Sequence, residues 1–378
     1  MANRESWIDN LKFFAICVVM MGHCSVEFFG NYPYKIWFHH ITVAFAMPIF
    51  FFLSGVTSFK RISRLCTIGH LDDYIQKLCY RLMLPGIFYY SIIRVFDDGI
   101  FPKVQCLIIW TILFSILYCL NKRCISTKSP MFLTILYTII IAHLCFNKFA
   151  GLWFFPCLMK IEIAAATSFL LYNRCRKTLL YGSVTFPFFL TIILCLCLKH
   201  LFDATAEFVI YFLLGALTAK YYRSVEPKNK GVIIAYSTYC VICFIIASYF
   251  TYEFRFYSLY KFQFYDLILS NNVEILFYRQ MAGLCWCLFF FYSSKIVSSH
   301  YSFISKLGTY TLSIYGVHVV LLSYFKGLVH VDATGWIVWI LLLCQSSLLF
   351  MVVLLFIKLG EKNWVSNWLI NGVIEYKK

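Results

Sequence analysis

Long apolar runs recur along the whole chain and constrain its fold more than any other feature. Most of the runs hold about 18 residues or more, which as a helix is enough to cross the hydrocarbon layer of a bilayer. Only 13% of the 378 residues are charged and 61% are hydrophobic, so the chain lacks the polar surface that a soluble domain of this length needs. The sequence therefore predicts an all-α, polytopic transmembrane bundle of about 10–12 spans. The candidate spans lie near 8–28, 38–58, 81–96, 104–120, 131–147, 153–172, 179–199, 205–219, 231–251, 273–293, 308–328 and 335–357.

The positive charge is distributed unevenly between the two sides of these spans. The formal net charge is +16, which by itself is also compatible with nucleic-acid binding. When the N-terminus is placed in the cytoplasm, about two thirds of the 33 Lys and Arg residues fall in cytoplasmic segments. This is the positive-inside asymmetry, so we expect both termini in the cytoplasm. The charge is accounted for by membrane orientation, and no nucleic-acid partner is expected.

The cysteines and the loops indicate one membrane domain. Most of the 17 cysteines lie inside apolar spans without the spacing of a metal site, as small core hydrophobes do. No internal repeat or low-complexity linker divides the chain, and no cleavable signal peptide is expected before the first span. We therefore expect a single integral-membrane domain over residues 1–378 that holds no metal.

The first span, IDNLKFFAICVVMMGHC (8–24), carries an acid, a base and an imidazole. Asp9 and Lys12 are three residues apart on one helical face, as a structural ion pair would be, and Lys12 is also close enough to the span's end to reach the interface. His23 follows Lys12 by eleven residues, about 16 Å along a helix and nearly the same azimuth. Ionisable residues within spans usually face the interior of the bundle, so this stripe predicts a functional His23.

Three later stretches carry further candidate site residues. Lys77 and Arg81 are four residues apart at the mouth of a span, a pattern that fits anionic lipid headgroups and cofactor phosphates equally well. Trp153, in GLWFFPCL (151–158), is typical of an interfacial aromatic belt. Tyr315 and His318 share a face in mid-span, where such a pair is either a hydrogen-bonded brace or part of a catalytic site. Further intramembrane charges, which together suggest a hydrated interior, are Lys160, Glu162, Glu207, Glu274 and Arg279.

Four of these motifs, in their order, resemble the membrane-bound acyltransferase 3 family, whose members O-acylate glycans at bacterial cytoplasmic membranes. IDNLKFFAICVVMMGH resembles the family's opening helix, in which ten residues separate a basic residue from a histidine. AMPIFFFLSG, GLWFFPCL and TLSIYGVH are similar to its second-helix, LWFL-like and late Tyr-x-x-His segments. Members commonly have ten core spans. One departure concerns the family's Arg-x-x-Arg pair: Arg81 matches its second position, whereas Leu78 stands at the first with Lys77 beside it.

The resemblance implies transfer of an acetyl group from cytoplasmic acetyl-CoA to a hydroxyl of a glycan or lipid-linked saccharide. The reaction would take place in the bacterial inner membrane, in contact with its lipids. The implied catalytic residues are His23 as general base, Asp9 and Lys12 as residues that order the same helix, and Tyr315 and His318 as residues that orient the acceptor or stabilise oxyanion charge. The implied residues for the acyl-CoA donor are Lys77, Arg81 and Trp153.

Two other classes of function remain open at the level of the sequence. The first is a transporter or flippase of a lipid-linked saccharide, which also needs many spans and buried charges, although no paired repeats with broken helices are visible. The second is a non-catalytic scaffold for polysaccharide assembly. If the protein is an acyltransferase, direct transfer is favoured over an acyl-enzyme, because the sequence has no nucleophile elbow and no Ser–His–Asp order.

Overall fold

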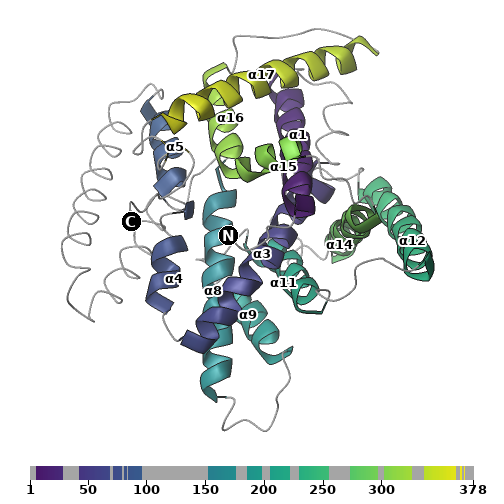
Figure 1. Cartoon of the computed structure of the whole chain (residues 1–378). Coiled ribbons are helices and arrows are strands. Elements are labelled where there is room, and N and C mark those ends of the chain that lie inside the picture. Colours follow the sequence, from purple (N-terminus) through teal and green to yellow (C-terminus); the bar gives the residue numbers. More distant parts are fainter. Residues whose placement is uncertain are drawn as a thin grey trace, which may run out of the picture.

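The computed structural model of the chain is built from helices in all the parts that it describes (Figure 1). The described residues are 6–28, 42–68, 71–78, 81–82, 84–95, 152–175, 185–197, 205–221, 230–254, 273–296, 302–325, 336–362, 367 and 370. The helices are α1 (Ser6–Phe28), the π-helix η1 (Thr42–Ala46), α3 (Met47–Ile68), α4 (Leu71–Leu78), α5 (Leu84–Val95), α8 (Phe154–Cys175), α9 (Thr185–Cys197), α11 (Thr205–Tyr221), α12 (Lys230–Phe254), α14 (Val273–Ile296), α15 (Ser302–Thr309), α16 (Thr311–Phe325) and α17 (Ile337–Glu361).

The prediction of an all-α bundle with many membrane spans is confirmed. All but two of the predicted spans fall on helices, and the two exceptions, 104–120 and 131–147, lie outside the described residues. Among the described helices, 6 are long and apolar enough to cross a membrane: α1, α3 with part of η1, α8, α12, α14 and α17. The predicted spans at α5, α9, α11 and α16 have described helices of 12, 13, 17 and 15 residues. At 1.5 Å per residue these reach only part of the way across a bilayer.

Helices α3 and α11 cross with their backbones in contact, at one glycine from each helix. A Cβ atom on Gly55 would lie 1.9 Å from the carbonyl oxygen of Phe212, and one on Gly215 would lie 1.9 Å from that of Phe52. Helix association in a membrane gains little from the hydrophobic effect and depends on close packing, which small residues permit. This crossing therefore requires glycine at both positions. Gly308 of α15 likewise meets the backbone of α1, where its Cβ would lie 1.9 Å from the carbonyl oxygen of Asp9.

The outer helices present apolar side chains to the surroundings. In Figure 1, α12 lies beside α14 at the right of the molecule, and α17 runs across α1 and α16 at the top. Exposed side chains on α12 and α17 include Ile234, Val241, Ile245, Leu348, Met351 and Leu355. Aliphatic side chains exposed on a membrane helix face lipid, so α12 and α17 form part of the lipid-facing surface.

Candidate active site

Two histidines from distant parts of the chain meet between α1 and α16. The ring centroids of His23 and His318 are 5.1 Å apart, with the ring planes tilted by 56°. His318 is completely buried, and His23 is half-buried. Helix α1 packs directly against α16, so the opening and the late motifs of the sequence share one location.

Tyr315 lies one turn before His318 on the same face of α16 and belongs to this cluster. Its ring centroid is 5.5 Å from that of His318, and it packs against Phe154 and Phe155 at 5.4 Å and 5.5 Å. A backbone hydrogen bond joins its hydroxyl group to Phe154, the first residue of α8. Tyr315 thus connects the histidine pair to the start of α8.

The imidazole of His318 is fixed by its own helix. Its Nδ1 lies 2.9 Å from the carbonyl oxygen of Ile314, one turn earlier. Its Nε2 is buried and has no hydrogen-bond partner among the described residues. Buried ring nitrogens are normally paired, so this atom is an exception that needs a chemical reason.

Trp153 lies at the head of α8, beside the residue that contacts Tyr315. Its ring is 5.2 Å from that of Phe208 and stacks on Phe51 at 6.4 Å. Phe51 and Phe208 in turn stack on each other at 4.6 Å. Trp153 is therefore part of an aromatic cluster of α3, α8 and α11 that adjoins the histidine pair through Phe154.

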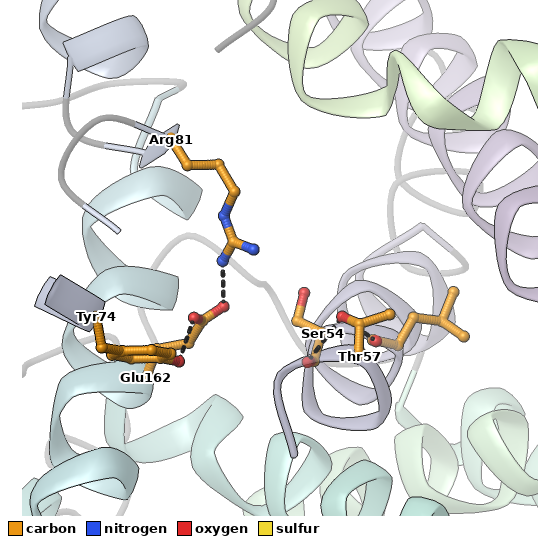
Figure 2. A network of polar contacts seen from close by, with 6 residues as sticks. Ser54, Thr57, Tyr74, Arg81 and Glu162 are labelled. Atoms are coloured by element: carbon orange, nitrogen blue, oxygen red, sulfur yellow. Dashed lines mark hydrogen bonds and ion pairs between the residues drawn. The ribbon is translucent and has the colours of Figure 1, made fainter. Parts of the chain in front are cut away.

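A second polar centre lies farther along α8, at Glu162 (Figure 2). The carboxylate of Glu162 accepts a hydrogen bond from Arg81 Nη2 at 2.7 Å and another from the Tyr74 hydroxyl at 2.8 Å. Glu162 is almost fully buried, whereas the Arg81 side chain is 26% exposed. Burial and the Glu162 carboxylate raise the pKa of Tyr74 well above its usual value, so the phenol remains protonated and donates. Figure 2 also shows Thr57, whose hydroxyl donates within α3 to the carbonyl groups of Leu53 and Ser54.

The guanidinium of Arg81 retains donor capacity beyond this ion pair. Its Nε is buried and has no hydrogen-bond partner in the described part of the chain. Lys77, which the sequence grouped with Arg81, is exposed at the last turn of α4. The described contacts of Arg81 are with Glu162, and the structure gives none between Arg81 and Lys77.

Asp9 and Lys12 lie on the first half of α1, about four and about three turns before His23. Asp9 is almost completely buried, and its backbone carbonyl is covered by Gly308 of α15. Lys12 is half-buried. Asp9 is at the α1–α15 contact, and both residues lie on the half of α1 away from His23.

Other intramembrane charges form a separate pair between α11 and α14. Arg279 Nη2 lies 2.5 Å from Glu207 Oε1, and Gln280 donates to the backbone carbonyl of Glu207 at 3.3 Å. Both charged side chains are about nine-tenths buried, so the pair ties the two helices together. Within the described ranges, no group of three His, Cys, Asp or Glu residues could hold a metal ion.

Sequence reasoning placed His23, Tyr315 and His318 among the site residues but did not find the partners of Arg81. Glu162 was visible only as one of several intramembrane acids, and Tyr74 carried no signal in the sequence. An acid in mid-span is a sufficient reason to look for a buried cation, but the hydropathy pattern does not say which cation lies beside it.

Comparison with known proteins identifies the family of the chain. A family model described as an acyltransferase domain matches residues 5–356, which is nearly the whole chain. The comparison with curated proteins gave no match, and the comparison with solved structures also gave none. The family match and the apolar helices together make the chain a multi-pass membrane acyltransferase. The chain therefore belongs to the acyltransferase 3 family.

Proposed function

We propose that the protein transfers an acetyl group from cytoplasmic acetyl-CoA to a hydroxyl of a cell-surface or lipid-linked glycan at the outer face of the bacterial cytoplasmic membrane. The main support is the meeting of His23 and His318 inside the bundle, with Tyr315 beside them. An imidazole is the side chain best suited to remove a hydroxyl proton near neutral pH. A half-buried histidine in a membrane helix is also costly unless it has a task there.

In the proposed reaction, His23 is the general base. It takes the proton from the acceptor hydroxyl as the oxygen attacks the thioester carbonyl carbon. The new C–O bond forms, the C–S bond breaks, and the thiolate of CoA takes from His23 the proton that came from the acceptor hydroxyl. No covalent acyl-enzyme is needed. Tyr315, held by Phe154, orients the groups around this centre.

The donor is proposed to bind along α8, with its phosphates toward Lys77 and Arg81 and its arm reaching past Trp153. Phe154 and Glu162 are eight residues apart on α8, which corresponds to about 12 Å along the helix axis. A donor that carries its reactive group at the end of a long arm suits two centres separated in this way. Arg81 supports the assignment because Glu162 fixes one edge of its guanidinium while the buried Nε is left to donate to a ligand. Asp9 and Lys12 would stabilise the half of α1 that leads to the site.

The direct test compares the wild type with His23→Ala in a strain that makes a candidate surface glycan. Base-labile O-acetate on the glycan is the readout, at matched protein levels in the membrane and matched thermal unfolding temperature. We expect O-acetate with the wild type and a loss of about 10²–10⁴-fold in transfer with the variant. Release of CoA from acetyl-CoA by the purified protein provides a second readout that does not depend on the choice of glycan.

The outcomes separate the proposals. Equal amounts of O-acetate with both proteins would support acetyl transfer but contradict the role of His23 as its general base. Absence of both acetate and CoA release in the wild type would contradict acetyl transfer. Uptake of a lipid-linked saccharide without any acyl donor would instead support a transporter.

A further inference from the structure

Helix α17 carries a short polar stretch inside the most apolar of the six candidate membrane spans in the described residues. The residues Cys-Gln-Ser-Ser (344–347) interrupt its apolar run, and Ser346 lies nine residues after Ile337, about 14 Å along the helix axis. In the hydrocarbon layer no water satisfies a polar group, so such side chains normally bind one another or face a functional site.

The hydroxyl group of Ser346 is buried without a hydrogen-bond partner. The residue is 8% exposed, and its Oγ has no partner among the described residues. Serines in other described helices, such as Ser168 and Ser323, donate to the carbonyl group four residues earlier in their own helix. Ser346 makes no such bond, so its O–H remains available to a group from outside the helix.

The preceding residue, Gln345, holds a second unpaired polar atom. It is half-buried, and its Oε1 is buried with no hydrogen-bond partner in the described part of the chain. A primary amide has two N–H donors and an acceptor oxygen, and a hydroxyl group both donates and accepts. Neither group carries a charge. The two side chains together therefore suit a ligand group that is neutral and that both donates and accepts hydrogen bonds.

This polar stretch lies beside the histidine pair. The thiol of Cys24, the neighbour of His23 in α1, interacts with the Ser346 hydroxyl, although without the geometry of a hydrogen bond. Helix α17 packs against both α1 and α16, which carry His23 and His318. The buried Nε2 of His318 also has no hydrogen-bond partner among the described residues. Unpaired polar atoms therefore occur on α16 and on α17 at the same side of the candidate active site.

The position and the chemistry favour the glycan over the acyl donor as the ligand. The donor is proposed to bind along α8, whose main contacts in the described structure are with α3, α4, α9 and α11. In Figure 1, α17 crosses the top of the molecule and α8 lies well below it. The phosphates of CoA need cations, which this stretch of α17 does not supply. A saccharide presents several hydroxyl groups, each of which donates and accepts.

We propose that Ser346 and Gln345 form a subsite for the acceptor, in which they bind a saccharide hydroxyl next to the one that is acylated. The identity of this ligand rests on the proposed acyl transfer. The bound hydroxyl would supply the partner that each buried atom lacks among the described residues. The subsite holds the sugar and takes no proton from it, so the general base of the reaction is unchanged.

The first experiment measures stability and glycan binding without catalysis. Ser346→Ala is compared with Ser347→Ala, a matched control because Ser347 is exposed on the same helix. The full-length proteins in lipid nanodiscs are heated with and without base-treated glycan, from which O-acetate has been removed, and without acetyl-CoA. We expect Ser346→Ala to unfold at or above the wild-type temperature, because it loses a buried polar atom that had no partner. The glycan should raise the unfolding temperature of the wild type and of Ser347→Ala, and that of Ser346→Ala much less.

The second experiment separates the two substrates by kinetics. Ser346→Ala and Gln345→Met should each raise KM for the glycan by about 3–10-fold, as expected for the loss of one hydrogen bond, with KM for acetyl-CoA at the wild-type value. Ser347→Ala should match the wild type in both values. A rise in KM for acetyl-CoA with an unchanged KM for the glycan would place the two residues at the donor and overturn the proposal.

A purely structural role for Ser346 would give a different result. Ser346→Ala would then lower the unfolding temperature and leave both KM values unchanged, and this outcome would also overturn the proposal. Absence of acetyl transfer in the wild type would contradict the proposed function, whereas the heating experiment would still test the subsite. A stabilisation by glycan that is lost only in Ser346→Ala would support the subsite, and equal behaviour of the two serine variants would overturn it.

Discussion

At the scale of single residues, the carboxylate of Glu162 is the group on which two donors converge. Glu162→Gln removes the charge and offers an amide NH₂ where one carboxylate oxygen accepted, so Arg81 and Tyr74 cannot both keep an acceptor. We expect a loss of about 1–3 kcal/mol in the free energy of unfolding, held below the value for a fully buried pair because Arg81 is partly exposed. Unfolding in detergent micelles, followed by intrinsic tryptophan fluorescence, measures this.

Tyr74→Phe is the matched control for that substitution. It removes one neutral donor, keeps the ring and leaves the Arg81–Glu162 ion pair in place, so its cost should be near 1 kcal/mol. If Glu162→Gln proves no more harmful than Tyr74→Phe, the ion pair contributes nothing to stability and the carboxylate serves only the phenol.

The sequence identified individual site residues but could not predict the contacts between them. His23 was identifiable because an imidazole in an apolar span is costly, and Tyr315 and His318 because they share a helical face. The contact between His23 and His318 depends on the packing of α1 against α16, which no local pattern encodes. The pairing of Arg81 with Glu162 is likewise a tertiary contact between segments 81 residues apart.

At the scale of helices, the crossing of α3 and α11 gives the sharpest prediction. Gly55→Ala or Gly215→Ala would push a methyl group into a backbone carbonyl at 1.9 Å, and neither backbone can yield without separating the helices. We expect each substitution to lower the free energy of unfolding by about 3 kcal/mol or more, despite the better helix propensity of alanine. The measurement is the unfolding temperature of the purified variants, with membrane yield as a second readout.

Gly360→Ala is the control at this scale. Its Cβ would meet the end of the Ile370 side chain at 2.8 Å, and a flexible side chain can move aside. The change should therefore cost less than about 1 kcal/mol. Equal losses at Gly55 and Gly360 would show that the α3–α11 crossing is not tight in solution.

The positions of most helices could be predicted from the sequence, but the way in which they pack could not. In lipid every backbone polar group must be satisfied within the segment, so a long apolar run has few alternatives to a helix. Ten of the predicted spans accordingly coincide with described helices. Gly55 lies in AMPIFFFLSG and Gly215 in FLLGAL, and neither local sequence says that the two glycines face each other at a crossing.

At the scale of the whole molecule, the uneven distribution of Lys and Arg predicts which side of the bundle faces the cytoplasm. Alkaline phosphatase reports this directly, because its disulfides form only in the oxidising periplasm. Fused in an enteric bacterium after Glu253, at the end of α12, the reporter should be active. Fused after Lys295, at the end of α14, or after Lys378, it should be inactive. The two internal fusions differ by a single span and control each other for expression.

The orientation also bears on the chemistry, because it fixes the side from which each substrate arrives. With cytoplasmic termini, α4 and Arg81 lie toward the cytoplasm, where acetyl-CoA is found, and the end of α1 that carries His23 lies toward the outer face. The reverse pattern, active after Lys378 and inactive after Glu253, would put Arg81 on the side without acetyl-CoA. It would then remove the cytoplasmic donor from the proposed reaction even if His23 were essential, because the two centres on α8 would face the wrong compartments.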